Sequence, residues 1–247
     1  MKILGIDTST SCGSIGLIDE DIVIVEYLLN VTRTHSERLL LSINHVLEVG
    51  GCPMDDLDGW AVSLGPGSFT GLRIGVSTIK GLAFTTGKPV AGVSALDVLA
   101  YSIPATRYLI CPILDARKGE VYTAFYRYAT GDIVERISDY QAIDPSDLIR
   151  KISEKTVFLG SGLRTYGDYL RQSLQALATF APPPLNLPFG STVARLGLER
   201  LRKNKILDLS TFTPIYVRAS EAEIKWKEKH PDPVSFTSPR RSQDRIE

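Results

Sequence analysis

The sequence predicts an α/β fold in which one strand–helix unit occurs twice. Three short apolar strands separated by polar turns open the chain, and helices then alternate with strands. The same order of patterns starts again near residue 108. A glycine turn follows a buried strand at the matching place in each half, at residues 65–67 and 160–162. We therefore expect two lobes of similar topology.

The first unit opens with strand patterns at residues 2–7, 13–18 and 22–28. A helix is predicted over residues 34–49, with Thr34 as N-cap and Glu37 completing a capping box. Its core stripe contains Leu39, Ile43, Val46 and Leu47. A strand at 59–64, a helix at 72–86, a strand at 89–93 and a helix from residue 95 complete the unit.

The second unit repeats this order with strands at 108–115, 120–128 and 132–137. A helical stretch at 145–153 and a strand with its glycine turn at 156–162 follow. The repeat indicates a duplicated ribonuclease-H-like fold, with an N-terminal lobe over residues 1–103 and a C-terminal lobe over residues 104–218. Within the second lobe we expect a helix at 192–203 and a short strand at 214–217. The charged tail at 219–247 is predicted to be partly disordered.

The composition is that of an ordinary globular protein. Its 247 residues carry 28 basic and 28 acidic side chains, and 43% are hydrophobic. Balanced charge disfavours tight binding to nucleic acid by this chain alone. The three cysteines form no CxxC pair, which is typical of a reducing compartment. No segment resembles a signal peptide or a membrane span, so we expect a cytoplasmic protein without membrane contact.

Two turns are candidates for binding the phosphates of a nucleotide. Asp7, Thr8 and Ser9 follow the first strand directly, and Gly65 and Gly67 lie between a buried strand and the next helix. In sugar kinases and actin-like ATPases, an Asp at this first turn coordinates Mg²⁺ through water. The alternative interpretation is that these groups only satisfy backbone groups within the turns.

Several residues expected for nucleotide chemistry are missing. The glycine turn matches neither the P-loop nor the dinucleotide fingerprint, because the Lys-Ser/Thr pair is absent and three residues separate Gly67 from Gly71. Asp115 occupies the place of Asp7 in the second half, but Arg117 and Lys118 stand where small hydroxyl residues and glycine would be expected.

The histidines do not suggest a metal site. None of His35, His45 and His230 lies four residues from another, and the first two fall on different sides of one predicted helix. No serine lies in a Gly-x-Ser-x-Gly elbow. We therefore expect no metal, no cofactor and no catalytic residue.

The helix after the glycine turn has a face of small residues. Gly71, Gly75, Thr78 and Gly81 share this face, while Leu72, Val76, Ile79 and Ala83 form a core stripe. Small side chains let a second helix approach closely. The second helix either is the one at 34–49 or belongs to another molecule.

Several motifs together resemble the TsaB (YeaZ) family. They are ILGIDTST at 3–10, HSE at 35–37, GPGSFTGLRIG at 65–75, KGLA at 80–83, DARKGEVY at 115–122 and PIYVR at 214–218. The resemblance implies an ASKHA (actin/Hsp70-like) fold. It also implies a role in making threonylcarbamoyladenosine, the modified base beside the anticodon of tRNAs.

The resemblance further implies a non-catalytic paralogue of TsaD, the threonylcarbamoyl transferase. TsaD holds a metal with a His-x-x-x-His pair, whereas the matching segment here, residues 94–98, reads SALDV. The family pairs with TsaD through helices of the first lobe, lets TsaE join, forms homodimers through the same surface, and meets tRNA only through the complex. The residues expected in this interface are Ser36, Leu40, Leu41, Gly71, Gly75, Thr78 and Lys80.

The leading hypothesis is therefore a scaffold that binds and activates TsaD. The alternatives are an ASKHA-type phosphotransferase or ATPase that uses Asp7, and a glycoprotease-like metallopeptidase.

Overall fold

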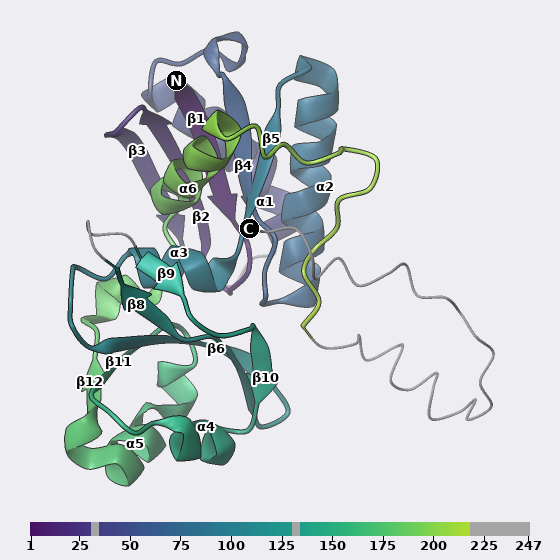
Figure 1. The fold of residues 1–247 in the computed structure, drawn as a ribbon. Coiled ribbons are helices and arrows are strands. Elements are labelled where there is room, and N and C mark those ends of the chain that lie inside the picture. The colour runs from purple at the N-terminus through teal and green to yellow at the C-terminus, as the bar shows by residue number, and fades with distance from the viewer. Residues whose placement is uncertain (31–34, 130–133, 218–247) are drawn as a thin grey trace, which may run out of the picture. The chain divides into compact units, whose positions relative to one another are not determined.

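The computed structural model describes residues 1–30, 35–129 and 134–217, with only the backbone at residues 35–37. Five strands form the first sheet (Figure 1), namely β1 (Lys2–Asp7), β2 (Gly13–Asp19), β3 (Ile22–Leu29), β4 (Gly59–Ser63) and β5 (Val90–Val93). Their order is β3-β2-β1-β4-β5. β2 is antiparallel to β1 and β3, whereas β1, β4 and β5 are parallel. These strands lie where the sequence predicts them.

The second sheet contains β6 (Leu109–Arg117), β7 (Glu120–Thr123), β8 (Tyr126–Tyr128), β9 (Val134–Arg136), β10 (Gln141–Ile143), β11 (Thr156–Leu159) and β12 (Ala178–Phe180). Its main path, β10-β7-β6-β11-β12, repeats the order of the first sheet. The duplicated ribonuclease-H-like fold is therefore confirmed.

The strand predicted at 132–137 is present as β9, but it is not the counterpart of β3. The strand predicted at 120–128 is broken into β7 and β8, and β9 pairs with β8. The place that β3 occupies in the first sheet belongs to β10, which pairs with β7. The hairpin of β8 and β9 is thus an addition to the repeated unit.

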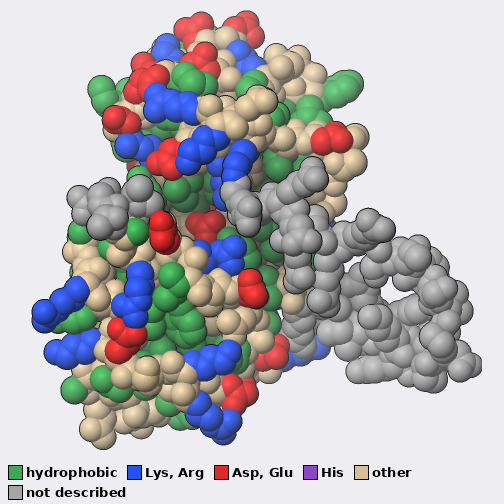
Figure 2. All heavy atoms as spheres, in the orientation of Figure 1, with side chains coloured by type: hydrophobic (Ala, Val, Ile, Leu, Met, Phe, Trp, Pro, Cys, Tyr) green, Lys and Arg blue, Asp and Glu red, His purple; other side chains and the backbone are tan. Residues whose placement is uncertain are grey.

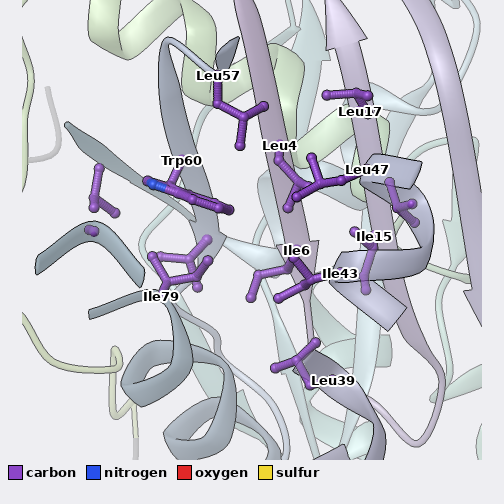
Figure 3. Close-up of a cluster of buried hydrophobic side chains, with 14 of the residues drawn as sticks. Leu4, Ile6, Ile15, Leu17, Leu39, Ile43, Leu47, Leu57, Trp60 and Ile79 are labelled. Atoms are coloured by element: carbon purple, nitrogen blue, oxygen red, sulfur yellow. The ribbon is translucent and has the colours of Figure 1, made fainter. Parts of the chain in front are cut away.

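Helices α1 (His35–Val49) and α2 (Phe69–Thr86) cover one face of the first sheet. Ser68 caps α2 by accepting a hydrogen bond from the amide of Gly71, and Gly87 ends the helix in the left-handed conformation. The predicted core stripe of α1 is buried against the sheet. Figure 3 shows Ile43 and Leu47 of α1 near Leu4 and Ile6 of β1.

Helix α6 (Gly190–Arg202) packs on the opposite face of the first sheet (Figure 1). The approach is close because glycines line it. A Cβ at Gly5 would lie 2.3 Å from the amide nitrogen of Ala194, and one at Gly197 would lie 2.3 Å from the Cβ of Ala61. The sequence division at residue 104 assigned this helix to the second lobe. Its contacts place it with the first sheet instead.

The remaining helices are α3 (Ala95–Tyr101), α4 (Pro145–Lys151) and α5 (Leu163–Leu174), with short 3-10 turns at η1 (Met54–Asp56), η2 (Gln175–Leu177) and η3 (Pro183–Asn186). None of the helices described here is long and apolar enough to cross a membrane.

Residues 214–217 do not form the predicted strand. Their one backbone hydrogen bond to the end of β4 joins the amide of Ile215 to the carbonyl of Leu64, at 2.7 Å. Contacts group residues 1–217 into one unit. The predicted N-cap Thr34 and the predicted tail at 219–247 lie outside the described residues.

Candidate functional site

Asp7 ends β1, and its carboxylate is buried within the turn that follows. One carboxylate oxygen accepts hydrogen bonds from the amide and the hydroxyl of Ser9, both at 2.8 Å, and the hydroxyl also lies 3.0 Å from the second oxygen. These short contacts from one neighbouring residue fix the turn. The Asp7 carboxylate is thus buried and engaged within its own turn.

The glycine turn packs directly on the Asp7 turn. The amide of Ser68 donates to the carbonyl of Ser9 at 2.6 Å, and a Cβ at Gly67 would lie 2.3 Å from the same oxygen. Gly65 has a φ of 106°, which favours glycine. The structure thus places the five residues of the predicted nucleotide site on two neighbouring turns. The Asp7 carboxylate is engaged within its own turn, and the carbonyl of Ser9 accepts from the amide of Ser68 in the glycine turn.

The first two glycines of the small-residue face also contact this turn. A Cβ at Gly71 would lie 2.1 Å from the carbonyl oxygen of Thr8, and one at Gly75 would lie 2.3 Å from its hydroxyl oxygen. Both glycines are buried. Gly71 and Gly75 therefore do not present the open helix face that their spacing predicts. They let α2 approach the end of β1, where the buried Thr8 hydroxyl has no hydrogen-bond partner among the described residues.

The turn after β6, which matches the Asp7 turn in the repeat, contains large cationic side chains. Asp115 accepts a hydrogen bond from the amide of Arg117 at 2.8 Å. Arg117, Lys118 and Gly119 all adopt positive φ values. The two cationic residues thus form the hairpin between β6 and β7, and this turn lacks the small side chains of a phosphate loop.

Residues 94–98, which contain no histidine, have a structural role. Ser94 caps α3, and Asp97 accepts hydrogen bonds from the hydroxyls of Tyr126 and Tyr140 at 2.8 and 2.9 Å. Arg200 of α6 lies 3.8 Å from the same carboxylate. Burial first, and then the charge of Asp97, raises the pKa of both tyrosines, which keeps them protonated as donors. Sequence reasoning missed this network because its members are far apart in the chain.

The described side chains show no arrangement for metal or thiol chemistry. No group of three or more His, Cys, Asp or Glu among them could hold a metal ion. The ring of His45 packs edge-on against that of Tyr27, with 5.6 Å between the ring centres. The side chains of His35 and His230 are not among those described. All three cysteines are buried, and burial raises the pKa of Cys111 to about 12.

The exposed side of α1 and α2, which we call the α1–α2 surface, carries large apolar side chains. Leu40 is 59% exposed, Leu41 73% and Phe84 81%. Gly81 also lies in the open, whereas Thr78 is half-buried. Lys80 is half-buried with its ammonium group 4.5 Å from the ring centre of Phe212, and the side chain of Ser36 is not described.

An additional cluster at the start of α2 was not predicted. The guanidinium of Arg73 lies 4.0 Å from the ring centre of Phe69, and its Nε donates to the hydroxyl of Tyr216 at 3.3 Å. The ring centres of Phe69 and Tyr216 are 5.2 Å apart. The spacing of Phe69 and Arg73 on one helix turn is a usable sequence signal. Nothing in the sequence indicates Tyr216, which is 143 residues from Arg73.

The comparisons decide the family. The protein of Bacillus subtilis named tRNA threonylcarbamoyladenosine biosynthesis protein TsaB is 35% identical over 92% of this chain and 99% of its own length. The chain belongs to the TsaB family. The Escherichia coli TsaB is 29% identical over 92% of this chain and 97% of the relative. The family described as TsaD, tRNA N6-adenosine threonylcarbamoyltransferase, matches residues 29–226, so TsaB and TsaD sequences are related over most of this chain.

Solved structures support the same fold. A Pseudomonas aeruginosa protein described as similar to the peptidase YEAZ superposes with a TM-score of 0.74 at 25% identity, covering 88% of this chain and 99% of that one. An activator of 2-hydroxyisocaproyl-CoA dehydratase from Clostridium difficile, solved with bound ADPNP, has a TM-score of 0.51 at 11% identity over 83% and 97% of the two chains. The second likeness concerns the fold alone. This TsaB-family chain has the two-lobed ASKHA fold.

Proposed function

We propose that this TsaB-family chain acts in tRNA threonylcarbamoyladenosine biosynthesis as a non-catalytic subunit that binds and activates a TsaD-type transferase and enables TsaE to join. The observation that carries the proposal is the α1–α2 surface. Leu40, Leu41 and Phe84 stand on two adjacent helices, each more than half exposed. Large apolar side chains exposed on neighbouring helices are typical of a protein–protein interface.

The geometry of the other candidate sites supports a subunit without its own chemistry. The segment matched to the transferase's histidine pair has no histidine, and the carboxylate of Asp97 within it is engaged by two tyrosines. The carboxylate of Asp7 is engaged by Ser9. These contacts disfavour the ATPase and metallopeptidase hypotheses, both of which need free ligands for a metal ion.

Activation of the partner would be positional. A bound subunit stabilises whichever conformation of the transferase it binds more tightly, and thereby raises the population of that conformation. When the partner is absent, the same apolar surface would join two copies of this chain. We expect tRNA to be met only through the complex.

Reconstitution tests the proposed function. Purified TsaD, TsaE, tRNA and a source of threonylcarbamoyl-adenylate are incubated with and without this chain, and the modified adenosine is measured. We expect product only when the chain is present, and none from the chain alone. Product formed equally well without the chain, or by the chain alone, would contradict the proposal.

Leu41→Glu tests the surface itself. Leu41 is 73% exposed, so the variant should fold normally, but association would bury an unpaired carboxylate. We expect affinity for TsaD to fall at least about 30-fold, with a matching loss of product in the reconstituted reaction. Tyr169→Glu, on the exposed side of α5, is the matched control and should bind like the wild type. Unchanged affinity in Leu41→Glu would remove the interface assignment. Gly75→Glu is unsuitable, because Gly75 is packed on Thr8.

A further inference from the structure

The arginine of the cluster formed by Phe69, Arg73 and Tyr216 is held in place before any partner binds. Its guanidinium lies over the ring of Phe69, and the hydroxyl of Tyr216 accepts from its Nε. The two contacts come from different parts of the chain and restrict the long side chain to one region. An arginine ordered in this way loses less conformational entropy on binding than a free one.

Within the part of the chain that the structure describes, Arg73 has no acidic partner. Helix α2 contains no acidic residue, and its N-terminus adds a partial positive charge close to the cluster. The terminal nitrogens of the guanidinium remain able to bind a carboxylate in bidentate geometry.

The cluster is continuous with the α1–α2 surface. At about 100° per residue, Arg73 and Phe84 lie within about 20° of each other around α2. Ser77 lies between them and is exposed. Phe69 is 38% exposed and Tyr216 44% exposed, so the aromatic rings flank the cation on the same accessible side. Arginine and tyrosine are also the residue types that most often dominate binding energy at interfaces.

We propose that Arg73 anchors the catalytic partner by binding an acidic side chain of the partner's contacting helix, with Phe69 and Tyr216 shielding the pair from water. This inference rests on the proposed function, because it assigns a specific contact within that interface. It predicts that the partner carries an Asp or Glu at the position that meets the start of α2.

A nucleic-acid phosphate is the competing ligand for such a cation. The observations favour the carboxylate, because the chain as a whole has no excess of basic residues. Figure 2 shows acidic and basic side chains interspersed on the side of the molecule that carries α6.

The experiment measures the affinity of the full chain for TsaD at two ionic strengths. Arg73→Gln should weaken binding about 10- to 30-fold at low salt and should flatten the salt dependence that the wild type shows. Arg73→Lys should restore only part of this loss, because an ammonium group neither stacks as a plane nor binds bidentately. Arg164→Gln, an exposed cation on α5, is the control and should match the wild type.

The outcomes separate this inference from the proposed function. If Leu41→Glu loses affinity while Arg73→Gln retains it, the anchor is wrong and the interface stands. If both variants bind like the wild type, both proposals fail. Full rescue by Arg73→Lys, or a loss that is independent of salt, would contradict a bidentate carboxylate contact. Weaker binding of tRNA to isolated Arg73→Gln, with unchanged affinity for TsaD, would assign the arginine to phosphate instead.

Discussion

Two glycines of α2 stand in opposite surroundings, although they belong to the same sequence pattern. A Cβ at Gly71 would lie 2.1 Å from the carbonyl oxygen of Thr8, which is a backbone atom and cannot rotate away. A Cβ at Gly81 would meet nothing within 4 Å. We expect Gly71→Ala to lower the free energy of unfolding by about 1–3 kcal/mol through overpacking. Gly81→Ala should raise it by about 0.4–1 kcal/mol, because alanine restricts the unfolded chain.

Urea unfolding of both variants against the wild type measures this difference. The two substitutions are predicted to change the free energy of unfolding in opposite directions. Equal changes would show that the contact between α2 and Thr8 is not formed in solution.

The spacing of the small residues therefore identified one face of α2, but it did not show what this face contacts. The pattern of Gly71, Gly75, Thr78 and Gly81 predicts only that something approaches α2 closely. For the first two glycines the neighbour is Thr8, more than 60 residues earlier in the chain. For Gly81 it is solvent in this structure. A local pattern cannot distinguish these cases, because the neighbours come from the tertiary fold.

At the scale of elements, α6 depends on a carboxylate from another part of the chain. Glu26 of β3 accepts hydrogen bonds from the amides of Gly190 and Ser191 at 3.0 and 2.8 Å, and so caps the start of α6. We expect Glu26→Ala to lower the free energy of unfolding by about 1–2 kcal/mol. Glu48→Ala, at an exposed site on α1, should change it by no more than about 0.5 kcal/mol. Equal stability of Glu26→Ala and the wild type in chemical denaturation would rule out this capping role.

The same carboxyl group gives a prediction for pH. Burial raises the pKa of Glu26, although the hydrogen bonds from Ser191 and Gly190 oppose the shift. Its contribution to stability is therefore complete below the unfolded pKa of about 4.3 and is lost as the pH rises through the higher folded value. The difference in unfolding free energy between the wild type and Glu26→Gln should shrink as the pH is raised from about 4. A difference that grows with pH would mean that the hydrogen bonds outweigh burial.

Helices and strands with a strong local hydrophobic pattern were predictable from the sequence. Elements whose place depends on the strand or sheet that they contact were not. The strands of the first sheet are short apolar runs bounded by turns, and helices α1 and α2 have apolar residues at helical spacing. The counterpart of β3 in the second sheet was assigned to the segment of β9 instead of β10. Both strands are three residues long, and only their pairing with other strands distinguishes them. Likewise, no local signal says that α6 returns to the first sheet, since an amphipathic helix fits either one.

At the scale of the whole molecule, Asp97 connects elements of both halves. Its helix, α3, follows the first sheet, whereas Tyr126 lies on β8 and Tyr140 just before β10. The buried hydroxyl of Tyr126 would be left without an acceptor if the carboxylate were removed. This loss, together with the loss of the hydrogen bond from Tyr140, predicts that Asp97→Ala lowers the free energy of unfolding by about 2–4 kcal/mol.

Because this network joins the two halves, its loss should also weaken the cooperativity of unfolding. Trp60 is buried in the core of the first sheet and reports on that half, once the other tryptophan is removed by Trp226→Phe. In this background we expect the transitions followed by Trp60 fluorescence and by far-UV circular dichroism to coincide, since residues 1–217 form one unit. In Asp97→Ala the two transitions should separate, with the second half unfolding first. Coincident transitions shifted together to lower denaturant would instead show that the network contributes stability without coupling the halves. Other contacts, such as the hydrogen bond from Ser14 of β2 to the carbonyl of Pro188, would then maintain the cooperativity.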